Sequence, residues 1–265
     1  MKRKRIFITN DDGWNAKGLE KLVEALKPLA EITIVAPATE KSACAHGMTL
    51  TRPMKMLSVD DDFYKMDDGT PTDCVFIGLN NLFDETNKPD LVISGINIGS
   101  NMGEDVTYSG TVAGAMEAVL QGVPGIAISQ VFQDINGTNK DRWEYELACK
   151  TIHDIAKKVL QGEFPLEKRK LLNINIPHCS IDECKGIKIT NLAIREYGND
   201  SHRYVSPRGE ETYWIGLHPL LWEPRDKNIL CDCDAVKDNY VSITPIKLDL
   251  TSYDDMKNLK EWIEK

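Results

Sequence analysis

The chain has 265 residues, of which 42% are hydrophobic, and these values suit one large α/β domain or a domain with a sizeable extension. Its formal net charge of -9 argues against duplex nucleic acid or an anionic membrane as a partner, because both require an excess of Lys and Arg. A small phosphorylated substrate is compatible with this charge, since one bound metal ion inverts the local field.

The first half of the chain alternates strand and helix patterns. Short apolar runs predict buried strands, and apolar residues at helical spacing predict helices between them. In chain order the predicted elements are a strand over 5–9, a helix over 18–29, strands over 32–36 and 91–94, a helix over 111–120, a strand over 125–129, a helix over 143–160 and a strand over 171–176. This alternation is typical of parallel βαβ units, so we expect an α/β fold with one mostly parallel sheet and helices on both faces.

The segment from Tyr197 to Asp234 has no helical period. Its aromatic residues are interrupted by Pro and Gly, which predicts extended hairpin segments that project from the core. Aromatic side chains on such a projection serve an oligomer interface or pack within a local subdomain, and the pattern favours neither. Beyond it, residues 241–246 predict a strand and residues 252–263 a terminal amphipathic helix.

The sequence predicts no membrane or secretory segment. The basic N-terminus precedes an apolar run, Ile6 to Ile8, that is far too short for a secretory signal, and no other stretch is long enough to span a bilayer. Among the seven cysteines, Cys231 and Cys233 have the wrong spacing for a CxxC redox pair or a zinc knuckle. We interpret all seven as reduced thiols and expect a cytoplasmic protein.

Polar residues follow the predicted strands at the edge where parallel sheets bind ligands. Asp11 and Asp12 come directly after the first strand, and two adjacent carboxylates stay ionised together only when a cation neutralises them. Their hard oxygen atoms suit Mg²⁺ or Mn²⁺. An ordinary acidic turn is the alternative, because Asp-Asp-Gly recurs at 67–69, where we expect a surface turn. The position at a strand end favours a metal site at Asp11 and Asp12.

A loop rich in glycine and asparagine is predicted over residues 95–103. Such a loop can pass close to a ligand and present backbone N–H groups, and an Asn carbonyl is a neutral ligand for a hard metal. The loop lacks the Gly-Lys-Ser/Thr ending of a Walker motif. It is not the dinucleotide-binding pattern either, because the next helix starts too late.

The helix over 111–120 opens with the sequence Ser109-Gly110-Thr111. Ser109 or Thr111 can cap the helix, and the free N–H groups of its first turn can form an anion site beside small residues. Taken alone, this pattern is more typical of a plain cap with close helix packing. A carboxylate metal site nearby would favour a phosphate pocket.

Two further segments carry polar side chains. Residues 41–47 follow the second strand, where Ser42 offers a hydroxyl ligand and His46 an imidazole. A lone histidine is more often a structural hydrogen-bonder than a catalyst, and both interpretations of His46 stay open. Residues 69–74 predict a turn into a helix, with Thr70 or Thr72 as a simple cap.

Together these segments resemble the SurE (survival protein E) family of 5′/3′-nucleotidases. The matching motifs are TNDDG at 9–13, VAP at 35–37 with Ser42, GTPTDCV at 69–75, SGIN at 94–97 with NMG at 101–103, YSGTV at 108–112, and a C-terminal block at 234–236 and 241–245. Each motif alone is weak, but their shared order is highly specific. One departure is Asn239, where a glycine is usual; Asn tolerates left-handed backbone.

The resemblance implies a Rossmann-like core, which we assign to residues 1–190, and a protruding hairpin arm over 191–240 used in dimer or tetramer assembly, followed by a C-terminal strand and helix over 241–265. It implies one divalent cation, Mg²⁺ or Mn²⁺, held by Asp11, Asp12, Ser42 and Asn97. It also implies phosphate or substrate contacts at Asn97, Asn101, Ser109, Gly110 and Thr111.

The expected reaction is hydrolysis of nucleoside 5′- and 3′-monophosphates to nucleoside and phosphate, with short polyphosphate as a further candidate substrate. Asp11 or Asp12 would orient or deprotonate the attacking water. A covalent aspartyl-phosphate competes with this route, but the Asp-x-Asp-x-Thr pattern of haloacid dehalogenases is absent. The alternative functions are a metal-dependent glycosyl- or nucleotidyl-transferase and a non-catalytic nucleotide-binding module.

Overall fold

The computed structural model describes residues 3–132, 144–196, 201–216 and 221–265. Its elements, in chain order, are β1 (Arg5–Thr9), α1 (Lys17–Leu26), β2 (Glu31–Pro37), β3 (Lys55–Asp60), β4 (Phe63–Asp67), α2 (Pro71–Asn81), β5 (Leu91–Ile98), η1 (Gly103–Thr107), α3 (Gly110–Leu120), β6 (Gly125–Gln130), α4 (Glu146–Leu160), β7 (Lys170–Ile176), β8 (Ile187–Ile189), β9 (Ile194–Glu196), β10 (Ser201–Val205), β11 (Glu211–Ile215), β12 (Leu221–Glu223), α5 (Asp232–Lys237), β13 (Val241–Lys247), η2 (Tyr253–Asp255) and α6 (Met256–Ile263).

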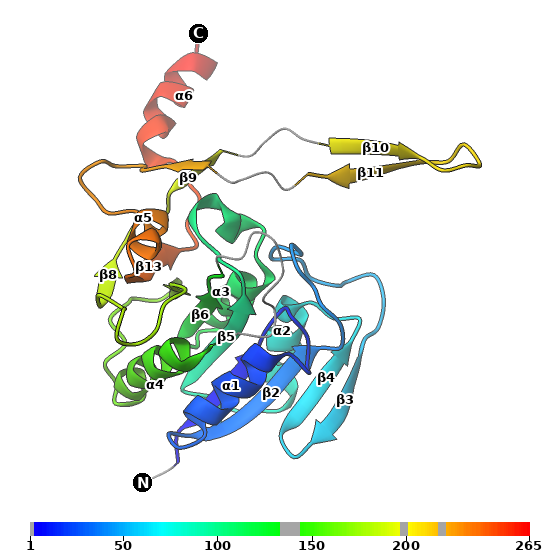
Figure 1. Cartoon of the computed structure of the whole chain (residues 1–265), viewed down its shortest axis with the longest axis vertical. Coiled ribbons are helices and arrows are strands. Elements are labelled where there is room, and N and C mark those ends of the chain that lie inside the picture. Colours follow the sequence, from blue (N-terminus) through cyan, green and yellow to red (C-terminus); the bar gives the residue numbers. More distant parts are fainter. Residues whose placement is uncertain (1–2, 133–143, 197–200, 217–220) are drawn as a thin grey trace.

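A nine-stranded sheet in the order β3-β4-β2-β1-β5-β6-β7-β13-β8 forms the centre of the molecule. The run from β4 through β2, β1, β5 and β6 to β7 is parallel, whereas β3 is antiparallel to β4 and β13 is antiparallel to β7. Helices α1 and α4 pack together on one face of the sheet, and α2 and α3 pack together on the other (Figure 1). The predicted α/β fold is confirmed.

The core lies on both faces of β1, whose side chains alternate between two hydrophobic clusters. Ile6 and Ile8 face the cluster that includes α1 and α4, and Phe7 faces the cluster beneath α2. All three side chains are fully buried. Burying a side chain of this size contributes about 1.5–3 kcal/mol to folding. Packing on both faces therefore holds β1 between the two layers of helices, and it also fixes the position of the carboxyl end of β1.

Two helix boundaries differ from the predicted ones. The helix predicted over 18–29 ends at Leu26, and Pro28 explains the early end because it has no backbone N–H to continue the helical hydrogen bonds. The helix predicted over 143–160 begins at Glu146. Residue 143 lies outside the described residues.

One strand is longer than its predicted range, and one strand pair has no counterpart among the predicted elements. β5 was predicted over 91–94 but continues to Ile98, with an irregular register against β6 between Ser94 and Asn97. Glycine and asparagine in this stretch have low strand propensity, which hid the extension. The β3–β4 hairpin was missed because β3 is mostly exposed and lacks an apolar period.

Three local predictions about turns are confirmed. The acidic stretches around β4 are exposed turns, where Asp62 and Asp68 have φ angles of 55° and 57°. Thr70 caps α2 in a capping box with Asp73. Asn239, just before β13, has a φ angle of 63°, the left-handed backbone that Asn tolerates.

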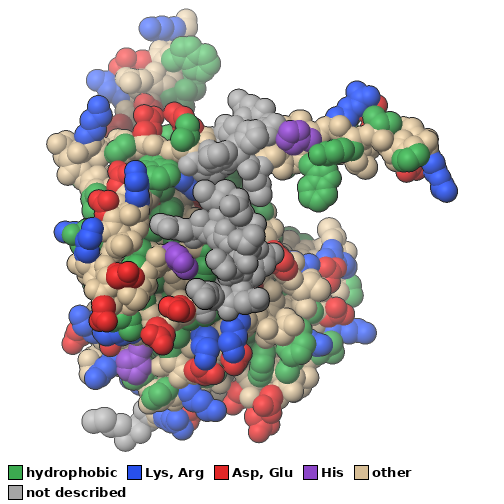
Figure 2. All heavy atoms as spheres, in the orientation of Figure 1, with side chains coloured by type: hydrophobic (Ala, Val, Ile, Leu, Met, Phe, Trp, Pro, Cys, Tyr) green, Lys and Arg blue, Asp and Glu red, His purple; other side chains and the backbone are tan. Residues whose placement is uncertain are grey.

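The projecting hairpin is also confirmed. β10 and β11 form a two-stranded antiparallel sheet that extends away from the core, and every residue in both strands is exposed (Figures 1 and 2). Tyr213, Trp214 and Ile215 are 64%, 69% and 84% exposed, so these strands do not form a locally packed subdomain. Among the described residues, no helix combines the length and the apolar character needed to cross a bilayer.

Close packing of α1 on β5 gives a first testable prediction. A Cβ atom on Gly18 would lie 2.0 Å from the carbonyl oxygen of Ile96, which is backbone and cannot easily move. Alanine favours a helix by about 1 kcal/mol over glycine, but overpacking costs about 1–3 kcal/mol or more. We therefore expect Gly18→Ala to lower the free energy of unfolding, measured by urea denaturation. The exposed Glu24→Ala in the same helix should stay within about 0.5 kcal/mol of wild type, and equal stability of the two variants would contradict this packing.

Candidate active site

The candidate site lies at the carboxyl end of β1, in the middle of the parallel sheet. After Thr9 the chain turns through Asn10 to Gly13, and the Asn10 side-chain amide donates to the Gly13 carbonyl at 2.9 Å. Gly13 has a φ angle of 103°, which glycine adopts without strain. The turn leaves Asp11 only 5% exposed and Asp12 partly buried, so two neighbouring carboxyl groups are withdrawn from water at a strand end.

Asp11 is bonded to the first turn of α3. The backbone N–H of Thr111 donates to Asp11 Oδ2 at 3.1 Å, and the Thr111 hydroxyl donates to Asp11 Oδ1. A Cβ atom on Gly110 would lie 2.9 Å from the Asp11 Cβ, so only glycine permits this close approach. Ser109 caps the helix by accepting from the Val112 N–H at 3.0 Å. The helix N-terminus predicted to hold an anion thus lies directly against the predicted metal ligand.

Asp12 is bonded to the end of β5. Its Oδ2 accepts the Ile98 N–H at 3.2 Å, which brings the neighbouring Asn97 to the same edge of the sheet. The Asn97 side-chain nitrogen donates to the Gly99 carbonyl at 3.0 Å. This hydrogen bond uses the amide nitrogen of Asn97. The amide oxygen, which is the atom that a cation would bind, takes no part in it.

The backbone next to Ser42 lies against the aspartate pair, but the Ser42 side chain points toward Glu40. The N–H of Lys41 donates to the Asp11 carbonyl at 2.7 Å, so the loop after β2 runs against the end of β1. The exposed Ser42 hydroxyl donates to Glu40 Oε1 at 2.7 Å. The structure therefore brings the four predicted ligands to one edge without directing the Ser42 hydroxyl at the carboxylates.

Asn101 is held inside the sheet edge by its own hydrogen bonds. Its backbone N–H donates to Asn175 Oδ1 at 2.9 Å, and its side-chain nitrogen donates to the Ser129 hydroxyl at 2.8 Å. Its carbonyl accepts from the side chains of Asn173 and Asn175. Asn101 thus anchors the segment after β5 to β6 and β7, and its predicted substrate contact stays a prediction.

Burial and mutual repulsion govern the charge of the aspartate pair. Burial raises the pKa of Asp11, although the hydrogen bonds from Thr111 oppose this rise. Burial, followed by the charge of Asp11, raises the pKa of Asp12 to about 7. The charge of Glu40 raises the pKa of both groups further. Near neutral pH, without a cation, the pair therefore tends to retain a proton.

The donor set fits a hard divalent cation. Two carboxylates, a hydroxyl and an amide carbonyl offer only oxygen, which Mg²⁺ and Mn²⁺ prefer. The buried Asn10 Oδ1, next to Asp11, has no hydrogen-bond partner within the described ranges of the chain. Within the described part of the chain, no group of three or more His, Cys, Asp or Glu side chains could hold a metal, so a site here depends on neutral oxygen ligands beside two carboxylates.

Two residues near Asp11 and Asp12 are not among the residues predicted from the sequence. Glu40 lies two positions before Ser42, and its acidic side chain was the only signal available. Tyr145 is 4% exposed, and its hydroxyl has no hydrogen-bond partner among the described residues. The hydroxyl oxygen would lie 3.4 Å from a Cβ on Gly18. Burial, followed by the charge of Asp12, raises the pKa of Tyr145. A lone tyrosine before a helix gives no sequence signal for this position.

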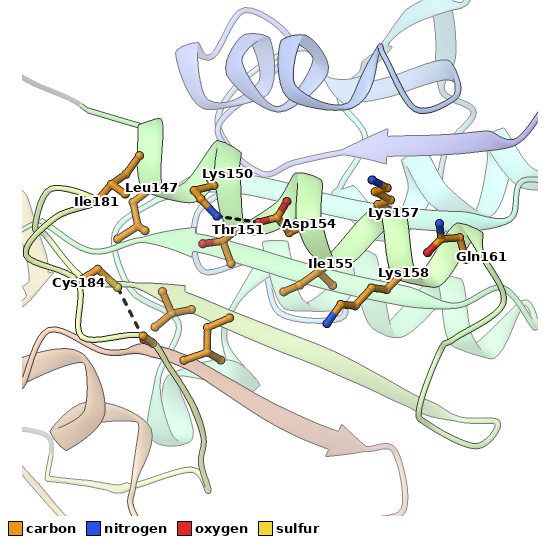
Figure 3. A pocket seen from close by; sticks show the side chains of 13 residues that line it. Leu147, Lys150, Thr151, Asp154, Ile155, Lys157, Lys158, Gln161, Ile181 and Cys184 are labelled. Atoms are coloured by element: carbon orange, nitrogen blue, oxygen red, sulfur yellow. Dashed lines mark hydrogen bonds and ion pairs between the residues drawn. The ribbon is translucent and has the colours of Figure 1, made fainter.

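A separate hollow of about 630 Å³ lies between α4 and residues 181–187 (Figure 3). None of its lining residues belongs to the motifs at the strand ends. Lys150 on its wall pairs with Asp154 at 2.8 Å, and the Cys184 thiol contacts the Gly186 carbonyl. We assign the chemistry to the Asp11–Asp12 edge because the convergent polar groups lie there.

The raised pKa of Asp12 predicts a pH-dependent stability of the metal-free protein. Between pH 3.8 and about 7 the unfolded chain loses this proton while the folded protein keeps it, so the free energy of unfolding falls as pH rises. Asp12→Asn removes the charge, so we expect it to stabilise the protein at pH 8 by on the order of 2 kcal/mol more than at pH 5. Urea denaturation in chelator measures this difference.

The exposed Asp61→Asn, which also removes one negative charge, is the matched control for the pH experiment. It should change the free energy of unfolding by less than about 0.5 kcal/mol at either pH. An equal effect of Asp12→Asn at pH 5 and pH 8 would contradict the raised pKa of Asp12.

Comparison with known proteins identifies the family. The family model described as "Survival protein SurE" matches residues 6–199. Proteins named 5′-nucleotidase SurE from Aliarcobacter butzleri and Helicobacter hepaticus are 58% and 55% identical to the chain, each over 98% of it and 99% of the relative. The crystal structure of the SurE protein from Aquifex aeolicus is 41% identical, with a TM-score of 0.80 over 98% of this chain and 100% of that one. The chain belongs to the SurE family.

Proposed function

We propose that the chain is a metal-dependent 5′-nucleotidase that hydrolyses nucleoside 5′-monophosphates to nucleoside and phosphate at the Asp11–Asp12 edge. The names of its near full-length relatives support this activity. The observation that carries the assignment is the contact of Asp11 with Thr111, which joins a cation-binding carboxylate to a helix N-terminus suited to phosphate. Nucleoside 3′-monophosphates and short polyphosphates are further candidate substrates, because they present the same terminal phosphate.

One Mg²⁺ or Mn²⁺ is the proposed cofactor, held by the side-chain oxygens of Asp11, Asp12, Asn97 and Ser42. Ser42 would join the other three by turning its hydroxyl from Glu40 toward the carboxylates. A bound divalent cation supplies positive charge that polarises the phosphate oxygens. All four ligands are oxygen donors, and the all-oxygen set favours these ions over softer metals.

The protein groups would then act on the phosphate and the attacking water. The start of α3, around Ser109, Gly110 and Thr111, would stabilise charge on the phosphate oxygens through the helix dipole. The Thr111 and Val112 N–H groups are already bonded to Asp11 and Ser109. Asn97 and Asn101 would contact the phosphate or the rest of the substrate. Asp11 or Asp12 would orient or deprotonate the attacking water.

Attack by water is favoured over an aspartyl-phosphate route. Both oxygens of Asp11 accept hydrogen bonds from Thr111, which reduces the nucleophilicity of this carboxylate. A glycosyl- or nucleotidyl-transferase and a non-catalytic binding module are set aside, since the names of the relatives support neither.

The arm, the assembly and the cellular location extend the proposal. We assign residues 1–190 to the catalytic core, 191–240 to an oligomerisation arm and 241–265 to the C-terminal strand and helix, of which β13 joins the core sheet. Exposed aromatic residues on β10 and β11 support a dimer or tetramer formed through the arm. The seven cysteines are free thiols, which supports a reducing, cytoplasmic location.

Removal of the Asp11 carboxylate tests the proposed site. We expect Asp11→Asn to lower kcat by at least about 100-fold while the thermal midpoint stays equal or rises, since a buried charge is removed. Phosphate release from a nucleoside 5′-monophosphate with Mn²⁺ measures the rate. Asp67→Asn, in the exposed Asp-Asp-Gly of the β4 turn, should keep wild-type activity. Full activity in Asp11→Asn, or equal wild-type activity in excess chelator, would overturn the proposal.

A further inference from the structure

The segment that carries Ser42 is held in an unfavourable backbone conformation. It spans residues 38–54 between β2 and β3 and is called the Ser42 loop below. Ala43 and Ala45, on either side of Cys44, have φ angles of 57° and 52°. Left-handed backbone is unfavourable for a residue with a Cβ atom, so contacts elsewhere must hold this loop in place.

The first part of the loop lies directly on the candidate site. The N–H of Lys41 bonds to Asp11, and the N–H of Ala45 donates to the Tyr108 carbonyl at 2.9 Å, just before α3. A Cβ atom on Gly110 would meet the Cys44 sulfur at 2.8 Å, so the loop also packs against the N-terminus of α3. A shift of the loop would therefore move Ser42 and uncover the proposed phosphate pocket together.

His46 fastens the loop to a buried carboxylate on α3. Its Nε2 lies 3.0 Å from Glu117 Oε2, and Gln121 donates to the other Glu117 oxygen at 2.8 Å. The Glu117 side chain is 4% exposed, against 32% for His46. Burial would raise the pKa of Glu117, but the hydrogen bonds from His46 and Gln121 outweigh it and lower the pKa. Glu117 is therefore an ionised group held by His46 of the loop and by Gln121 at the end of α3.

The second part of the loop is fastened to α2. Asp73, 1% exposed, accepts the N–H and the hydroxyl of Thr49, both at 2.8 Å, and the Thr70 hydroxyl donates to the Gly47 carbonyl at 2.7 Å. His46 thus lies between the segment that touches the site and the segment anchored at α2. Among the described residues, the bond from His46 to Glu117 is the only side-chain hydrogen bond between the loop and α3.

We propose that His46 and Glu117 form a positioning pair that holds the Ser42 loop against the candidate metal site and so raises the affinity for the cation. His46 Nε2 is bonded to Glu117, which is not one of the proposed metal or substrate ligands. In this proposal His46 therefore acts by holding the loop and not on the substrate. This inference rests on the proposed metal site. It assigns a role to the histidine for which catalytic and structural interpretations were both open.

Manganese binding tests the pair without relying on activity. Titration calorimetry with Mn²⁺ alone should give His46→Ala a dissociation constant about threefold to tenfold above wild type, the range expected for a partly exposed charged hydrogen bond. His46→Gln places an amide nitrogen near the position of Nε2 and should recover affinity to within about twofold. His153→Gln, on the distant α4 where His153 bonds to the Ala25 carbonyl, should bind like wild type.

Kinetics separate positioning from chemistry. At saturating Mn²⁺, His46→Ala should recover a kcat within about twofold of wild type, because the cation itself would restore the loop. Wild-type Mn²⁺ affinity in His46→Ala, or an equally weak His46→Gln, would overturn the pair, and so would a kcat that stays low at saturation.

Asp11→Asn in the same titration distinguishes a failure of the positioning pair from a failure of the proposed metal site. Loss of Mn²⁺ binding in that variant together with wild-type binding in His46→Ala would reject only the positioning pair. Wild-type binding in Asp11→Asn would reject the proposed metal site and, with it, the pair. The thermal midpoint of each variant shows that binding is compared between folded proteins.

Discussion

The structure depends on how the Asp11 carboxylate is kept in a nearly dry position. A buried carboxylate costs free energy unless hydrogen bonds or a positive charge compensate it. Thr111 supplies two hydrogen bonds from the start of α3, and the helix dipole adds partial positive charge there. These contacts compensate the burial of Asp11 only in part, because its pKa is still raised, and burial together with the charge of Asp11 raises the pKa of Asp12. The fold thus contains a local excess of negative charge that a divalent cation would relieve.

The rest of the fold serves to assemble this edge. The buried β1 brings Asp11 and Asp12 to the middle of a parallel sheet, where the ends of β2 and β5 lie on either side. β5 reaches Asp12 because it continues past its irregular stretch to Ile98. The loop after β2 reaches Asp11 through Lys41. Each contact is a single hydrogen bond from a different segment, so the arrangement requires the tight packing of α1, α2 and α3 on the sheet.

Much of this could be predicted from the sequence, since it depends on local patterns. Apolar runs and helical spacing gave the strands and helices of the core. The strand-end rule alone does not separate Asp11 from Asp67 of the same tripeptide, because Asp67 also ends a parallel strand, β4. The two differ in burial, since Asp11 is buried and Asp67 is exposed. The family resemblance gave the candidate ligands, and their convergence on one cation stays a prediction. Contacts between distant segments could not be read in this way. The direction of the Ser42 hydroxyl toward Glu40, the internal bonds of Asn101 and the burial of Glu117 depend on packing between segments that no local pattern records.

The central claim is that one divalent cation relieves the charge of the Asp11–Asp12 pair. Anomalous diffraction from crystals grown with Mn²⁺ and inorganic phosphate tests it most directly. The account predicts one strong manganese peak in contact with oxygens of Asp11, Asp12 and Asn97, with the Ser42 hydroxyl turned away from Glu40 and phosphate density at the start of α3. A manganese peak elsewhere, with the aspartate pair unliganded at saturating Mn²⁺ and pH 8, would contradict the account.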